Sequence, residues 1–176
     1  MKSCRLDITP AAAVVLAIGY YLDDSGWYAA ILPAILCHEL GHWIAICFLG
    51  GRVTSLRVDL SGICMETTAF SDRISEISVL AAGPVFGFLW GAAAERLNNP
   101  WGEKSQLISL ALNSFNLLPA LPLDGGRILY CLTRSTRLLR SSGLVTAAAL
   151  VYIAIRSGHW GLIIPAVLLS VHAVRT

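Results

Sequence analysis

Charged residues are scarce in this sequence, and their scarcity excludes several classes of protein. Only 14% of the 176 residues are Asp, Glu, Lys or Arg, while 56% are hydrophobic. A typical soluble domain has about 25% charged residues. Too few polar side chains remain to cover a water-facing surface of this size. The composition therefore argues against a soluble globular enzyme, a disordered chain or a nucleic-acid-binding protein, and it indicates an integral membrane protein.

The sequence also lacks any Cys-x-x-Cys pair. Its five cysteines are scattered and odd in number: Cys4, Cys37, Cys47, Cys64 and Cys131. This pattern argues against a disulfide framework and against a zinc site built from cysteines. No internal repeat, low-complexity tract or linker divides the chain. We therefore expect a single domain over residues 1–176.

Six apolar stretches, separated by short polar breaks, follow one another along the chain. A helix needs about 20 residues to cross a hydrocarbon core of about 30 Å. The second, third and fourth stretches reach that length, whereas the others have to tilt little or thin the bilayer. We predict an all-α polytopic membrane protein with about six transmembrane helices, and a count of four or five stays open. The predicted spans are 8–22, 27–49, 74–94, 105–123, 142–156 and 160–174.

The basic residues indicate how these spans are oriented. With the N-terminus inside, six spans place three of the 13 Lys and Arg residues outside (Arg96, Lys104 and Arg156) and leave ten, 13 minus 3, inside. Basic residues favour the cytoplasmic side of a membrane. We therefore predict that both chain ends are cytoplasmic, in what we expect to be a bacterial cell membrane.

A short segment between the second and third spans has a different pattern. In residues 52–68, Leu56, Val58 and Leu60 alternate with polar residues, and Ser61 with Gly62 offers a turn. This alternation predicts a short β-hairpin on the cytoplasmic side, with an ordinary loop as the alternative. An edge strand there would let an extended substrate add as one more strand.

Carboxylates are nearly absent from the predicted spans, so their positions are informative. Glu76 lies at the entrance of its span, but Glu39 lies in the middle of 27–49, flanked by His38 and His42. Ionisable groups at bilayer depth are costly and usually functional. On a helix the two histidines share a face and can bind one ion, while Glu39 can reach a water on that ion. This His-Glu-x-x-His pattern predicts a metal site, with a chance match of core histidines as the alternative.

A third ligand should come from another helix, because a catalytic zinc site usually takes three protein ligands and leaves one position for water. The strongest candidate is Asp124, within residues 116–126. Pro119 and Pro122 forbid a regular helix there, and irregular backbone at membrane depth has to be buried in protein or line a wet cavity. The predicted topology places Asp124 in the same cytoplasmic half as His42. Its alternative role is to cap the helix that follows.

These two motifs resemble those of the site-2 protease family of intramembrane zinc metalloproteases. The matching residues are His38-Glu39-x-x-His42, Asn116-x-x-Pro119-x-x-Pro122-x-Asp124-Gly125 and, between them, a Gly83-Pro84 break. The compact layout is most similar to the sporulation-factor protease branch, which cuts membrane-associated pro-proteins. Because the sequence ends at Thr176, we do not expect the cytoplasmic regulatory domain that some relatives carry.

The resemblance implies one zinc ion per chain, bound by His38, His42 and Asp124, with Glu39 as the general base. Asn116 matches the asparagine that holds the substrate or the developing oxyanion; on its own it could be an ordinary helix-end residue. The implied activity is an endopeptidase that cleaves in or near the membrane segment of a membrane-associated protein, by means of a zinc-activated water.

Two alternatives to a protease remain. A metal transporter or sensor would need polar residues along a path across the bilayer, and an inactive relative would lack Glu39 or a ligand. The expected partners are a membrane-associated protein substrate and the lipid bilayer, with no nucleic acid. A regulatory membrane protein and a homo-oligomer stay open.

Overall fold

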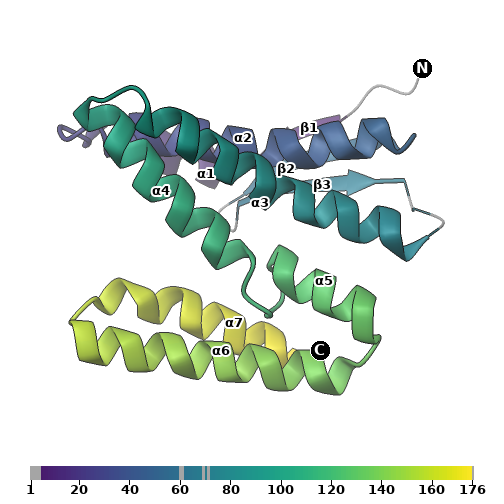
Figure 1. The fold of residues 1–176 in the computed structure, drawn as a ribbon. Helices are drawn as coiled ribbons and strands as arrows, with labels where there is room; N and C mark the ends of the chain where they lie inside the picture. Colours follow the sequence, from purple (N-terminus) through teal and green to yellow (C-terminus); the bar gives the residue numbers. More distant parts are fainter. Residues whose placement is uncertain (1–4, 60–61, 69, 71, 176) are drawn as a thin grey trace. The chain divides into compact units, whose positions relative to one another are not determined.

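The computed structural model describes residues 5–59, 62–68, 70 and 72–175. The chain divides into two compact units, residues 1–113 and 114–176, and each is described by itself. Figure 1 shows the described elements. In chain order they are β1 (Arg5–Ile8), α1 (Pro10–Tyr21), α2 (Trp27–Phe48), β2 (Val53–Asp59), β3 (Gly62–Thr67), α3 (Arg73–Glu95), α4 (Pro100–Asn116), α5 (Asp124–Thr133), α6 (Thr136–Ser157), a 3-10 turn (Trp160–Leu162) and α7 (Ile163–Arg175).

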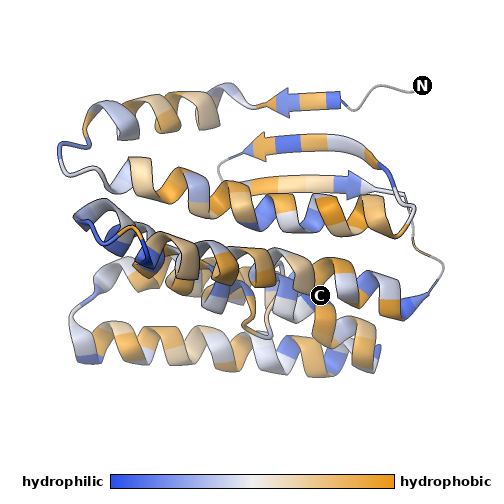
Figure 2. Cartoon of the chain, turned by 45° about the horizontal axis from the view of Figure 1, so that its top comes forward, coloured by the Kyte–Doolittle hydropathy of each residue, from blue (hydrophilic) through white to orange (hydrophobic). Residues whose placement is uncertain are grey.

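Every predicted span coincides with a helix for most of its length. In the described part of the chain, α2, α3 and α6 are long and apolar enough to cross a membrane. The helices carry long hydrophobic stretches, whereas β1 and β2 alternate between hydrophilic and hydrophobic residues (Figure 2). The remaining apolar helices, α1 and Trp160–Arg175, are shorter. The chain is thus a mostly helical membrane protein with a small sheet, and the count of six spans stays a prediction.

One expectation about a helix boundary is wrong. The predicted span 105–123 ends early, because α4 has 17 residues and stops at Asn116. The two prolines that follow account for this, since proline lacks the N–H that a helix interior needs. The Gly83-Pro84 pair lies inside a continuous helix, as the predicted span 74–94 requires, because α3 runs from Arg73 to Glu95.

The sheet contains the predicted hairpin and one strand that was not predicted. β2 and β3 pair antiparallel, with Arg57 opposite Cys64, while β1 pairs with β2 in parallel, with Leu6 opposite Leu56. Leu60 and Ser61, which belonged to the predicted hairpin, lie outside the described residues. The strand order is β1-β2-β3. The stretch with Leu56 and Val58 is therefore the central strand, and the expectation that it offers an edge is wrong.

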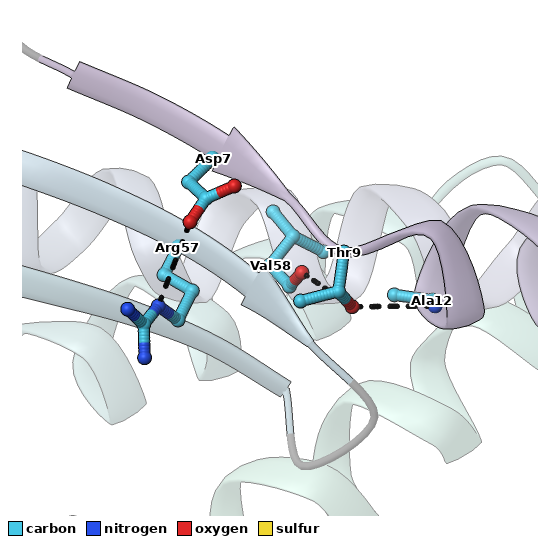
Figure 3. A network of polar contacts seen from close by, with 5 residues as sticks. All are labelled: Asp7, Thr9, Ala12, Arg57 and Val58. Carbon is cyan, nitrogen blue, oxygen red and sulfur yellow. Dashed lines mark hydrogen bonds and ion pairs between the residues drawn. The ribbon is translucent and has the colours of Figure 1, made fainter.

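Figure 3 shows how the start of α1 is fixed to β2. The Thr9 N–H donates to the Val58 carbonyl at 2.9 Å, and the Thr9 hydroxyl donates to the same oxygen at 3.3 Å. That hydroxyl also accepts from the Ala12 N–H, which caps the helix. Asp7 and Arg57 lie 3.9 Å apart across the strands, but both are exposed and contribute little. The residues before α1 and the strand after α2 therefore lie at the same end of these two helices, as the predicted topology requires.

In the first unit α2 and α3 lie side by side (Figure 1). Their contact is built on small buried residues, which let two backbones approach closely. A Cβ at Gly41 would meet the Ala82 carbonyl oxygen of α3. Just before the start of α2, the Lys104 ammonium of α4 donates to the Ser25 carbonyl at 2.6 Å. The starts of α2 and α4 thus lie at the same end, again as predicted.

In the second unit α6 and α7 form a helical hairpin, and the irregular segment 117–123 packs against it. Its Ala120 is fully buried in a cluster with Ala147, Leu150, Ala166 and Leu169. A Cβ at Gly125 would overlap the Leu117 carbonyl, so only glycine lets α5 start against this segment. The segment is thus anchored in protein at Ala120, whereas Leu117, Pro119 and Pro122 are exposed, and the expectation that this backbone is buried in protein or lines a wet cavity stays a prediction.

Candidate metal centre

His38 and His42 meet on one face of α2. Their Nε2 atoms are 3.1 Å apart, and their rings are nearly perpendicular, at 84°. The spacing of four residues brings the two side chains together on the helix, as the sequence predicts. His38 is buried and His42 is half-buried. The two imidazoles are therefore held close together within the first unit.

The Nδ1 atom of His42 defines which of its ring nitrogens can bind a metal. It lies 2.8 Å from the Val79 carbonyl oxygen of α3. A carbonyl oxygen only accepts hydrogen bonds, so Nδ1 carries the hydrogen and the neutral ring has its lone pair on Nε2. A hydrogen bond of this kind from the second ring nitrogen is typical of metal-binding histidines.

His38 has the same arrangement with a different partner. Its Nδ1 atom lies 2.8 Å from the Asn113 side-chain oxygen of α4. Both rings thus use Nδ1 for a neighbouring helix and present Nε2 to a common point. Two nitrogens bound to a tetrahedral zinc at about 2.0–2.1 Å lie about 3.3 Å apart, close to the observed separation. The two histidines therefore fit a zinc ion without rearrangement.

The ring of His42 occupies space that Gly83 leaves open. A Cβ at Gly83 would overlap the His42 imidazole, and one at Gly87 would overlap the Asn113 side chain. Sequence reasoning missed Val79, Gly87 and Asn113, and it named Gly83 only as part of the Gly83-Pro84 pair. One signal was available, since Gly83, Gly87 and Gly91 recur every four residues on α3 and predict a face that another element approaches closely.

Glu39 follows His38 on α2 and is half-buried. A residue on a helix is turned by about 100° from its predecessor. Glu39 therefore lies beside the face that carries the two imidazoles, as the motif predicts. This position suits a group that acts on a water or a substrate rather than on the ion.

The other two predicted site residues belong to the second unit. Asp124 is the first residue of α5 and is buried, at 8% exposure. The N-cap of α5 is Leu123, which argues against the alternative that Asp124 serves as that cap. Asn116 is the last residue of α4 and is half-buried. That these residues act together with the histidines stays a prediction.

Comparison with known proteins gives one family and several relatives. Residues 11–173 match the model of the Peptidase M50B-like family. A zinc metalloprotease of Methanocaldococcus jannaschii is 29% identical over an alignment of 143 residues, and the match covers 71% of this chain and 41% of that protein. Stage IV sporulation protein FB of Bacillus subtilis is 26% identical over an alignment of 136 residues, and the match covers 73% of this chain and 47% of that protein. The chain thus spans less than half the length of these two relatives.

A solved structure has the same fold. It is the site-2 protease from Methanocaldococcus jannaschii, which matches with a TM-score of 0.71 over 97% of this chain and 89% of that one. The sequence identity is 21%. At this level the likeness is evidence for the fold, and the roles of individual residues have to be argued from their own geometry.

Proposed function

Since this chain belongs to the Peptidase M50B-like family, the site-2 protease type of membrane metalloprotease, we propose that it is an intramembrane zinc endopeptidase. Its substrate is a membrane-associated protein, cut in or near its membrane segment. The observation that carries the proposal is the pair of imidazoles on α2, whose Nε2 atoms lie 3.1 Å apart. Membrane-embedded histidines arranged in this way suit a metal ion better than they suit core packing.

In the proposed site His38, His42 and Asp124 hold one zinc ion. When bound, zinc supplies a Lewis acid and a nucleophilic water at neutral pH. Glu39 takes a proton from the attacking water and later gives it to the leaving amine nitrogen. Asn116 donates its amide N–H groups to the substrate carbonyl as negative charge develops on its oxygen.

The transporter alternative requires a polar path across the bilayer. The buried hydroxyls of α4 lie on one line, but Ser105 donates to the Ala30 carbonyl and Ser109 donates to the Gly87 carbonyl. Both side chains are fully buried. They fasten helices to one another rather than line a channel, so this alternative gains no support from them.

The test of the proposal is metal-dependent cleavage by the purified chain in lipid vesicles. A chelator should stop cleavage of a labelled membrane-helix substrate, and added zinc should restore it, because the ion is needed for attack on the peptide bond. Gel analysis of the fragments measures the effect. Cleavage that continues in the zinc-free protein would refute a zinc protease, and zinc uptake into vesicles without cleavage would favour the transporter.

Substrate engagement is proposed to involve β3. A substrate helix has all its peptide groups hydrogen-bonded, so it has to be extended before attack and then needs new partners. The Val58 carbonyl accepts from Thr9, so the polar groups of Val58 face β1. The N–H and C=O groups of successive residues on a strand point to opposite sides, so those of Arg57 face β3. Cys64 lies opposite Arg57, and its N–H and C=O groups face β2. Those of the next residue, Met65, therefore point to the outer edge of the sheet. Among the described strands β3 therefore offers an outer edge for a substrate strand.

Met65→Pro should slow cleavage by about two- to tenfold, since it removes one outward N–H and a backbone hydrogen bond contributes about 0.5–1.5 kcal/mol. Proline is tolerated at a sheet edge, so zinc content should not change. Met65→Ala is the matched control, because it shortens the side chain and keeps the N–H. Equal rates for the two variants would contradict strand addition at β3. Val58→Pro is not a suitable test, because it would remove a donor inside the sheet.

A further inference from the structure

A line of fully buried polar side chains runs along α4. Ser105, Ser109 and Asn113 follow one another at intervals of four residues and have no exposed surface. The Ser105 hydroxyl accepts from the Trp90 indole N–H at 2.9 Å. Asn113, at the end of the line, reaches the ring of His38 on α2. This line of side chains therefore links the contacts among α2, α3 and α4 to the imidazole of His38 in the candidate metal centre.

The side-chain amide of Asn113 can lie in one orientation only. Its Nδ2 atom donates to the Ser109 carbonyl at 2.6 Å and to the Ser109 hydroxyl at 3.3 Å. A backbone carbonyl accepts and cannot donate, so the NH₂ group has to face Ser109. The amide oxygen is then left to face His38, at 2.8 Å from Nδ1.

This orientation fixes the tautomer of His38. The Asn113 oxygen can only accept, so the His38 Nδ1 atom has to donate and the lone pair of the neutral ring lies on Nε2. The same Nε2 atom faces His42. Gly87 is part of the arrangement, since a Cβ there would overlap the Asn113 amide. Asn113 thus holds the His38 ring in both the tautomer and the orientation that metal binding needs.

We propose that Asn113 is a positioning residue of the metal centre, which fixes the Nδ1–H tautomer of His38 so that Nε2 binds the ion. The inference rests on the proposed function, because it assumes that His38 binds zinc. It adds a residue outside both sequence motifs. When a residue that hydrogen-bonds the second ring nitrogen of a metal-binding histidine is lost, metal affinity typically falls by about 10–100-fold.

The experiment measures how fast a chelator withdraws zinc from the purified full-length chain. Asn113→Leu, which has the same number and branching of side-chain heavy atoms but cannot accept a hydrogen bond, should release zinc about 10–100-fold faster than the wild type. Asn113→Asp keeps an acceptor oxygen toward His38 and should hold zinc within a few-fold of the wild type. Ser105→Ala is the matched control, because it removes a buried hydroxyl of the same line two turns away and should leave zinc release unchanged.

A spectroscopic measurement separates positioning from general packing. With ¹⁵N-labelled histidine, the wild type and Asn113→Asp should show a hydrogen-bonded Nδ1–H on His38, and Asn113→Leu should lack it. Zinc release at the wild-type rate in Asn113→Leu would overturn the inference and leave the protease proposal intact. Equally fast release in Ser105→Ala and Asn113→Leu would also overturn it. A wild-type chain that binds no zinc would instead refute the proposed function.

Discussion

Glu39→Gln should abolish cleavage while the chain keeps its zinc and its fold. Glutamine has nearly the same size as glutamate, but its amide cannot take a proton from the attacking water. General acid–base catalysis contributes about 10²–10⁴-fold to rates of this kind, so the cleavage rate should fall by at least that factor. Single-turnover cleavage of a labelled substrate in lipid vesicles measures the rate, and elemental analysis of the same sample measures the zinc.

Glu76→Gln is the matched control for this experiment. Glu76 is the other carboxylate of the predicted spans and lies in the first turn of α3. The same chemical change there should leave both zinc and cleavage unaltered. Substantial turnover by Glu39→Gln would exclude Glu39 as the general base. Loss of zinc in Glu39→Gln would place this carboxylate among the ligands instead.

His38→Ala and His42→Ala should each lose the zinc ion, and with it all activity. Each change removes one of three ligands, and the two that remain cannot complete the three-ligand site of a catalytic zinc. Asp124→Asn should weaken zinc binding, because an amide oxygen lacks the charge of a carboxylate. Zinc per chain after purification, and its rate of release to a chelator, measure these effects.

His159→Ala is the control for the histidine variants, since His159 lies at the start of the 3-10 turn in the second unit. It should keep a full complement of zinc. A double variant of His38 and His42 that still carries one zinc per chain would mean that the ligands lie elsewhere. The cysteines would then be the first residues to examine.

The features that sequence predicts well are those set by local pattern. The alternation from Leu56 to Val58 predicts the hairpin, because side chains on a strand alternate between its two faces. The spacing of His38 and His42 predicts a shared face, because residues four apart on a helix are neighbours. Pro119 and Pro122 predict the irregular segment before α5, since two prolines three residues apart each remove a backbone donor and together disfavour a helix.

The features that sequence misses depend on contacts between distant segments. β1 has four residues, all exposed, and exists because it pairs with β2 some fifty residues later. Asn113 reaches His38 across 75 positions of sequence, and no motif links them. His42 is held by the carbonyl of Val79, a group that every residue has, so the identity of this residue carries no signal. The groups that hydrogen-bond the second ring nitrogen of a metal-binding histidine therefore have to be found in the structure.

X-ray absorption at the zinc edge of the purified wild-type chain tests the central claim most directly, because it reports which atoms bind the ion. The chain offers four histidines and five cysteines as possible ligands, and nitrogen and sulfur bind zinc at different distances. We predict two imidazole nitrogens at about 2.0–2.1 Å with oxygen as the remaining ligands, from Asp124 and water. A sulfur ligand at about 2.3 Å, or a spectrum with fewer than two imidazoles, would contradict the proposed site.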